Sequence, residues 1–197
     1  MIRDALLARR SIRRYTDQPV VRAVIEDVLN AATWAPSAHN RQPWRFAVVT
    51  SADAKERLAR AMGERLRADL NADHAPPDVI EKDASRSYAR MTGSPVLIVV
   101  CISMVDMDKY PDEKRTNAEY LMATQSTAMA VQNLLLAAHD HGLGACWMCA
   151  PLFCPDVPIC ELALPADWQP QALITLGYPA EHKDKTRFPL ESRLLWR

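Results

Sequence analysis

The fold is decided by residues 113–141, EKRTNAEYLMATQSTAMAVQNLLLAAHDH. This stretch contains no proline and no glycine, and it is rich in Ala, Leu, Met and Gln, which favour helices. We therefore expect one long helix that ends at Gly142, since glycine commonly terminates helices. Residues 128–138 are apolar on nearly every side, which predicts that this part of the helix lies inside the core. The other elements are expected around this central helix.

Shorter elements are expected on both sides of it. After Pro19, apolar residues such as Val21, Ile25 and Val28 recur at helical spacing, which predicts a helix with one buried stripe that ends at Pro36. Further helices are expected over residues 2–8, 52–69, 78–91 and about 155–162, and strands over residues 46–50, 96–103, 145–149 and 172–176. Helices and strands alternate irregularly, and helix dominates. The pattern predicts a single helix-rich α+β domain over residues 1–197.

The charge balance excludes some classes of partner. The 197 residues include 24 Lys and Arg and 24 Asp and Glu, so no global field attracts nucleic acid or an anionic membrane. The first residues are charged every few positions and lack the apolar stretch of a signal peptide. The longest apolar run, residues 95–105, is about half the ~20 residues that span a bilayer. We therefore expect a cytoplasmic protein with no nucleic-acid and no membrane partner.

The cysteines admit two interpretations. Five cysteines are an odd number in a chain without a signal peptide, which argues against a disulfide framework. Cys146 and Cys149 have the spacing of a zinc or iron–sulfur motif, with Cys154 and Cys160 as conceivable further ligands. Core-like Trp, Met, Leu and Phe residues surround them, and free cysteine often packs as a small apolar side chain. We favour that interpretation and predict no metal site.

Residues 9–14, Arg-Arg-Ser-Ile-Arg-Arg, concentrate positive charge in a chain with no net charge. Guanidinium groups suit a phosphate, because they donate charge-assisted hydrogen bonds to its oxygens. Taken alone, the same residues also fit a solvated basic turn, since runs of charge usually lie at the surface. The neighbouring motifs decide between these two interpretations.

Two further motifs accompany the basic turn. Residues 35–44 read Ala-Pro-Ser-Ala-His-Asn-Arg-Gln-Pro-Trp, and residues 142–147 read Gly-Leu-Gly-Ala-Cys-Trp. In their order and spacing, the three motifs resemble the nitroreductase family. The resemblance covers nearly the whole chain: it includes a Leu-Gly-Tyr-Pro sequence after the last expected strand and a basic Lys-x-Arg near the C-terminus. The resemblance implies a nitroreductase-like three-layer α/β/α fold with a small, mostly antiparallel sheet flanked by helices. It also implies a domain-swapped homodimer with two FMN sites, each lined by both subunits.

The resemblance further implies which residues line each FMN site. One set would hold the phosphate and the ribityl chain: Arg9, Arg10, Ser11 and Arg13, joined by Lys185 or Arg187. A second set would come from the partner subunit and line the isoalloxazine ring: Pro36, Ser37 and Asn40. A third set would pass near the reactive edge of the ring: Trp147, Met148 and Cys149. The tail, residues 187–197, would wrap the partner subunit.

The expected activity follows from the same resemblance. A hydride would pass from reduced nicotinamide, NADH or NADPH, or from a similar donor, through FMN to a nitroaromatic, a quinone or a related acceptor in a ping-pong cycle. The flavin carries the hydride chemistry, so the sequence demands no acid, base or nucleophile from the protein. We therefore name no catalytic side chain.

A narrower resemblance leaves the substrate open. Residues 152–157 and 164–170 look like the C-terminal FMN-binding domain of the bifunctional enzyme that completes the deazaflavin coenzyme, a domain that reduces a dehydro precursor. This resemblance makes Arg67 and Asp69 candidate substrate contacts, and His39 lies in the flavin loop, where it could face the pocket. Reduction of nitro compounds or quinones is equally compatible. A non-catalytic flavin-binding protein is a further alternative, because fold does not guarantee activity.

Overall fold

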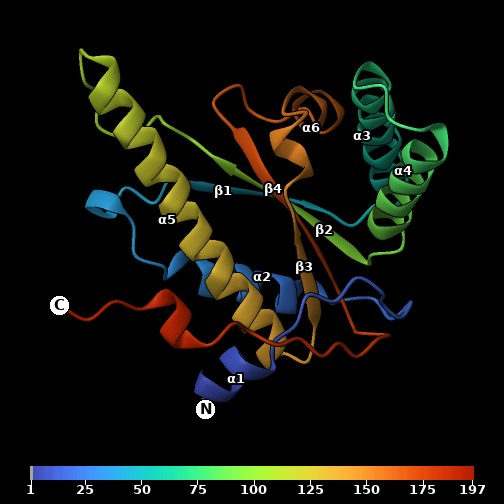
Figure 1. The fold of residues 1–197 in the computed structure, drawn as a ribbon, viewed down its shortest axis with the longest axis horizontal. Helices are drawn as coiled ribbons and strands as arrows, with labels where there is room; N and C mark the ends of the chain where they lie inside the picture. Colours follow the sequence, from blue (N-terminus) through green and yellow to red (C-terminus); the bar gives the residue numbers. More distant parts are fainter. Residues whose placement is uncertain (1) are drawn as a thin grey trace.

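The computed structural model describes residues 2–197 and has three layers, with a four-stranded sheet in the middle (Figure 1). The strands are β1 (Trp44–Val49), β2 (Val96–Ile102), β3 (Gly144–Met148) and β4 (Gln169–Gly177). They lie in the order β1-β2-β4-β3, and every neighbouring pair is antiparallel. The α+β class and the small antiparallel sheet are confirmed.

Helices cover both faces of this sheet. On one face lie α1 (Ile2–Ala8), α2 (Arg22–Thr33) and α5 (Glu113–Asp140), and on the other lie α3 (Ala52–Ala72), α4 (Pro77–Thr92) and α6 (Asp156–Glu161). Three short 3₁₀ turns complete the described elements: η1 (Ala38–Asn40), η2 (Ala150–Leu152) and η3 (Leu190–Arg193). Within residues 2–197, no helix is both long enough and apolar enough to cross a bilayer.

Strand β2 explains why the sheet is buried on both sides. Its sequence VLIVVCI is β-branched or apolar throughout, and each of its residues is at most 1 % exposed. Successive side chains of a strand point to opposite faces. Val96, Ile98 and Val100 therefore pack with α2 and α5, whereas Leu97, Val99 and Cys101 pack with α3, α4 and the residues around α6. One strand thus joins the two apolar cores.

The long helix has the predicted start and end. The Asp112 carboxylate accepts a hydrogen bond from the backbone N–H of Arg115 at 2.9 Å, which caps the N-terminus of α5. Gly142 follows the C-terminus with φ of 72°, a left-handed conformation that glycine adopts without a steric penalty. The helix boundaries were therefore readable from the sequence alone.

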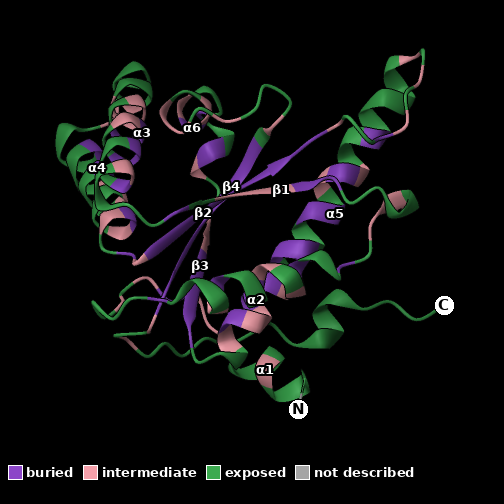
Figure 2. Ribbon diagram, turned by 180° about the vertical axis from the view of Figure 1, so that it is seen from behind, coloured by how far each residue is buried: buried purple, intermediate pink, exposed green. Residues whose placement is uncertain are grey.

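The prediction that residues 128–138 lie inside the core holds for one side of α5 only. Ala130, Leu134 and Ala138 are fully buried against the sheet and α2. The opposite side carries Leu121 and Met129, which are 57 % and 40 % exposed, and Figure 2 shows this side of the helix in green. A single chain therefore leaves apolar side chains on one side of its central helix uncovered.

The chain after β4 is also largely exposed to solvent. Apart from η3, residues 178–197 have no helix or strand, and Figure 2 shows this segment exposed along its length to the C-terminus. Phe188 is 77 % exposed, and Trp196 is 84 % exposed. Large apolar side chains in water carry an unfavourable hydration free energy that a partner surface would remove.

Candidate functional site

The basic turn that follows α1 is fixed beside the start of β3. The backbone N–H of Ile12 donates a hydrogen bond to the carbonyl oxygen of Ala145 at 3.0 Å, and Ser11 forms a bridge with the same residue. A Cβ atom on Gly144 would lie 2.7 Å from the Cβ of Ile12, so this close approach requires glycine. The glycine of the Gly-Leu-Gly motif is therefore what allows the arginine turn to dock on the sheet.

Tyr15 holds the other end of this turn. Its hydroxyl group donates to the carbonyl oxygen of Ile12 at 2.5 Å and lies 2.6 Å from the Thr175 Oγ1 atom in β4. Burial raises the pKa of the Tyr15 phenol well above its ordinary value, so the group stays protonated. The turn is therefore anchored to two strands, at Ala145 of β3 and at Thr175 of β4.

Arg10 and Arg187 lie near enough to Arg9 for their charges to act on it, and we call Arg9, Arg10 and Arg187 the arginine cluster. The pKa of Arg9 is lowered by partial burial and by the positive charges of Arg187 and Arg10. The Nε atom of Arg10 is buried and has no hydrogen-bond partner. Within residues 2–197, no carboxylate forms an ion pair with any of the three. The cluster is an uncompensated positive site.

A second group of positive charges lies next to it. Arg13, Arg14, Arg86, Arg90 and Lys183 line a cavity of about 400 Å³ together with Ala89 and Glu181. Burial and the nearby Arg13 and Arg86 lower the pKa of Arg90. The sequence analysis missed Arg90, because it lies in a polar helix among other charged residues and belongs to no motif. Only the packing of α4 brings it to the basic turn.

Strand β3 runs along the arginine cluster. Burial raises the pKa of the Cys146 thiol, and the charges of Arg13, Arg90 and Arg9 partly offset this effect. Further along, the chain reaches the surface at Cys149, whose sulfur accepts a hydrogen bond from Trp147 Nε1 at 3.1 Å. Cys146 is thus buried while Cys149 is exposed, and both are free thiols. Cys146 therefore lies near Arg9, Arg13 and Arg90, and the predicted residues Trp147, Met148 and Cys149 follow it along the chain toward the surface.

The loop before β1 is held by its own contacts. The Ser37 hydroxyl accepts a hydrogen bond from the backbone N–H of Gln42 at 3.1 Å, and the N–H of Ala38 donates to Ser126 Oγ of α5 at 3.1 Å. His39, Asn40 and Gln42 have φ between 51° and 53°, a left-handed conformation that is strained for residues other than glycine. The loop is thus fixed in an unusual shape against α5.

The structure separates this loop from the arginine cluster. The loop leads into β1 at one edge of the sheet, whereas the cluster borders β3 at the other, and neighbouring strands lie about 4.8 Å apart. The two sites also lie at opposite ends of the strands. Across the sheet, Ala145 is level with Val96 of β2, and Trp44 is level with Ile102 of β2. Val96 and Ile102 are six residues apart, so the two sites are separated by about 20 Å along the strands, at about 3.4 Å per residue. One chain therefore does not bring the two predicted halves together.

The remaining predicted residues lie in different surroundings. Arg67 of α3 forms a two-pronged ion pair with Glu81 of α4, at 2.8 and 3.0 Å, on the surface between these helices. Asp69 lines a small cavity that extends to Ala150 and Phe153, just beyond β3. Lys185 is exposed in the tail. Asp69, unlike Arg67, therefore lines a cavity next to the end of β3, where Cys149 of the predicted flavin edge lies; His39, the third candidate substrate contact, lies in η1.

Comparison with known proteins identifies the group to which this fold and these motifs belong. The family model described as the nitroreductase family matches residues 6–178. An NADH dehydrogenase of Thermus thermophilus is 30 % identical over 220 residues, covering 99 % of this chain and 95 % of its own. A protein of Methanothermobacter thermautotrophicus, whose name proposes an NADH dehydrogenase or NAD(P)H nitroreductase, is 33 % identical over 181 residues, covering 91 % of this chain and 78 % of its own.

Solved structures agree with the sequence relatives. A nitroreductase-type protein from Desulfovibrio desulfuricans, crystallised in complex with FMN, superposes with a TM-score of 0.76 at 30 % identity over 100 % of this chain and 96 % of its own. A BluB-like flavoprotein from Clostridium difficile has a TM-score of 0.83 at 23 % identity, over 100 % of this chain and 99 % of its own, and so shares the fold. The chain belongs to the nitroreductase family.

Proposed function

We propose that this protein is an FMN-dependent oxidoreductase that passes a hydride from NADH, NADPH or a similar donor to a nitroaromatic, quinone or related acceptor. The observation that carries the proposal is the arginine cluster. The charges of Arg10 and of Arg187, from the two ends of the chain, both act on Arg9, and within residues 2–197 no carboxylate forms an ion pair with any of the three. Three uncompensated guanidinium groups suit a dianionic phosphate such as that of FMN.

The surroundings of the cluster also fit a flavin mononucleotide. The unpartnered Nε of Arg10 is a donor that a phosphate oxygen would satisfy. Ser11 and Arg13 lie beside the cluster, where they would contact the ribityl chain. Lys185 precedes Arg187 by two residues in the tail and would join the phosphate contacts. Trp147, Met148 and Cys149 continue from the cluster along β3 and would border the ring. Positive charge from Arg13 favours the anionic form of a reduced flavin.

FMN supplies the hydride transfer itself, and the chain supplies binding, orientation and charge. We propose that donor and acceptor occupy one pocket in turn, which is compatible with a ping-pong cycle. The names of the Thermus thermophilus and Methanothermobacter thermautotrophicus relatives support a reduced nicotinamide as the donor. The FMN complex of the Desulfovibrio desulfuricans protein supports the cofactor.

We further propose that the working unit is a homodimer with composite sites. Pro36, Ser37 and Asn40 lie at the far edge and far end of the sheet from the arginine cluster, so these residues reach a flavin there only from a second subunit. The uncovered side of α5 and the exposed tail with Trp196 offer apolar surface for that subunit. A groove of about 470 Å³ between α1, α2 and α5, bordered by Trp34, offers a place for the partner's tail.

The first test is cofactor binding. The purified protein is expected to be yellow, to bind one FMN per chain and to gain thermal stability when FMN is added. A colourless protein that FMN does not stabilise contradicts the flavin proposal. Anaerobic addition of NADH, NADPH or a reduced deazaflavin in turn then identifies the donor by bleaching of the flavin absorbance.

The second test concerns turnover and the acceptor. The reduced protein is mixed anaerobically with nitroaromatics, quinones and the dehydro precursor of the deazaflavin coenzyme, and flavin reoxidation is followed. We expect the nitroaromatics and quinones to reoxidise it. Reoxidation by the precursor alone replaces our proposal with the biosynthetic alternative, and a flavin that none of the donors reduces favours a binding protein.

A further inference from the structure

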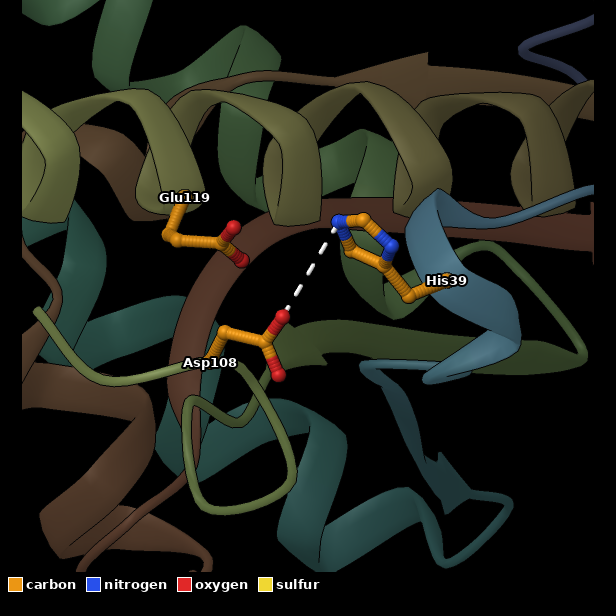
Figure 3. Close-up of side chains that lie close together, drawn as sticks. All are labelled: His39, Asp108 and Glu119. Atoms are coloured by element: carbon orange, nitrogen blue, oxygen red, sulfur yellow. Dashed lines mark ion pairs between the residues drawn. The ribbon is translucent and has the colours of Figure 1, made fainter.

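Three potential metal ligands meet at the end of the sheet opposite to the arginine cluster. His39 comes from η1, Asp108 from the loop between β2 and α5, and Glu119 from the second turn of α5 (Figure 3). One ligand atom from each lies within 4.8 Å of the other two. Figure 3 shows the three side chains pointing toward a common space, and we call this group the His39 cluster.

Glu119 makes this cluster unusual. Its side chain is 1 % exposed, and its Oε2 atom is buried without a hydrogen-bond partner. A buried carboxylate normally has a hydrogen-bond partner, an ion-pair partner or a metal ion, because removing its charge from water is costly. Within residues 2–197, no arginine, lysine or histidine forms an ion pair with Glu119. Its carboxylate is instead directed at Asp108 and His39.

Asp108 is already oriented by a second partner. Its Oδ1 atom accepts a hydrogen bond from the Arg41 guanidinium, while Oδ2 lies 3.9 Å from His39 Nε2. One oxygen is therefore fixed, and the other faces the imidazole and Glu119. Carboxylates that bind metals are commonly held in this way by a hydrogen bond to the oxygen that does not coordinate the ion.

We propose that the His39 cluster binds one divalent first-row transition-metal ion, such as Mn²⁺ or Zn²⁺. His39 Nε2 and one oxygen each from Asp108 and Glu119 are the ligands, and water completes the coordination on the exposed side of His39. One imidazole and two carboxylates are a ligand set that such ions accept. Glu119 gains the partner it lacks, and Asp108 keeps its contact with Arg41 through the oxygen that does not bind the ion. Bonds of about 2.0–2.2 Å require the ligands to move closer together.

The ion would join three segments that are far apart in the sequence. It would fix the loop of residues 36–42 to α5 and to the loop before α5. Within one chain this site lies at the other end of the sheet from the arginine cluster, but its loop is the one proposed to line the flavin of the partner subunit. The inference goes beyond the proposed function, and its failure is distinguishable from the failure of FMN binding, because titration measures bound metal and absorbance measures bound flavin.

The test is calorimetric titration of the full-length protein, freed of metal by a chelator, with MnCl₂. Manganese is chosen because it prefers carboxylate and imidazole ligands to thiolates, which excludes the five cysteines. We expect one Mn²⁺ per chain, loss of the free-Mn²⁺ signal in electron paramagnetic resonance, and a higher unfolding temperature with metal. Titration with ZnCl₂ then compares the two ions.

Two isosteric variants identify the ligands. Asp108→Asn and Glu119→Gln are each expected to weaken Mn²⁺ binding at least about tenfold, because each removes one anionic ligand. The matched control is Asp106→Asn, which neutralises a carboxylate in the same loop that pairs with Arg45 instead. This control is expected to bind Mn²⁺ like the wild type. FMN content is measured in all proteins, so that a loss of flavin is distinguished from a loss of metal.

Glu119→Gln is also expected to change thermal stability, in opposite directions relative to the wild type without and with metal. Without metal it is expected to be at least as stable as the wild type, because it removes an unpaired buried charge. With metal only the wild type is expected to gain stability. The proposal is overturned if the wild type binds neither Mn²⁺ nor Zn²⁺ stoichiometrically, or if Asp108→Asn and Glu119→Gln bind Mn²⁺ as tightly as Asp106→Asn does.

Discussion

The two ends of the sheet carry unpaired charges of opposite sign. At the β3 edge, the charges of Arg9, Arg10 and Arg187 act on one another, and no carboxylate in the described part of the chain forms an ion pair with them. At the β1 edge, Asp108 and Glu119 converge around a single histidine. Arg41 pairs with Asp108, whereas Glu119 has no cationic partner among residues 2–197. A chain with zero net charge thus carries two local imbalances of opposite sign.

This difference shows that overall charge says little about sites. Positive groups left together without a counter-ion suit an anion such as a phosphate, and negative groups left together suit a metal ion. The positive end is readable from the sequence because four of its arginines lie within six residues. The negative end is not readable, because His39, Asp108 and Glu119 are separated by 69 and 11 residues along the chain.

The strongest test of this comparison asks whether the two ends serve one flavin site across two subunits. Arg9→Glu and Asn40→Asp are each expected to abolish tight FMN binding in homodimers, because each places a negative charge where an anionic cofactor is proposed. Mixed after unfolding and refolding together, the two variants are expected to recover FMN at about one quarter of the sites, since each mixed dimer has one intact site. Fluorescence of bound FMN measures the recovery.

The control for this mixing experiment is each variant refolded alone, which is expected to recover no FMN. If the mixture also recovers none, while each variant is folded by circular dichroism, the site does not combine Arg9 of one subunit with Asn40 of the other.

A smaller effect is expected from neutralising single arginines. Arg9→Gln is expected to weaken FMN binding about ten- to a hundredfold, since a hydrogen bond to a charged group contributes about 1.5–3 kcal/mol. The matched variant Arg67→Gln removes an exposed arginine that pairs with Glu81, and it is expected to leave FMN affinity unchanged. Fluorescence titration gives both affinities. Equal losses in the two variants would mean that the arginine cluster has no special role.

Removing the tail tests the exposed apolar surface. Deletion of residues 193–197 takes away Leu195 and Trp196, which are 70 % and 84 % exposed in one chain. If a partner covers roughly 100 Å² of this surface, the loss is about 2.5 kcal/mol, or more than a tenfold weaker dimer. Analytical ultracentrifugation measures the dimer constant. As a control, Phe153→Ala removes a 77 % exposed aromatic residue next to α6 and is expected to leave dimerisation unchanged.

The smallest effect concerns the support of the basic turn. Tyr15→Phe removes the hydrogen bonds to Ile12 and Thr175, with an expected loss of about 1–2 kcal/mol of unfolding free energy. Because the folded phenol has a raised pKa, wild-type stability is present below the unfolded value of about 10 and falls as the pH rises above it. Tyr15→Phe has no phenol at this position, so its unfolding free energy is expected to lack this decrease at alkaline pH. Urea unfolding at pH 7 and at pH 10.5 checks both statements, and identical slopes against pH would refute the second.

The local sequence predicted a helix or strand correctly where its pattern fitted only one type of secondary structure. The absence of proline and glycine from residues 113–141, together with Gly142, predicted both ends of α5, and the structure adds the cap by Asp112. Strand β2, with seven apolar residues, is long enough for a strand and too short for most helices. Other boundaries moved: α3 ends at Ala72 rather than at residue 69, and β4 begins at Gln169 rather than at residue 172. Polar ends such as these depend on partners that the sequence does not show.

The sequence by itself determined the identity of the elements and the presence of a basic turn, because helix propensity, apolar spacing and clustered arginines are properties of neighbouring residues. Only the tertiary structure decided what these elements bring together. It joins Arg187 to Arg9, adds Arg90 through the packing of α4, and assembles His39, Asp108 and Glu119. It also leaves one side of α5 open. These outcomes depend on the packing of distant segments across the sheet, and that packing cannot be read from local spacing.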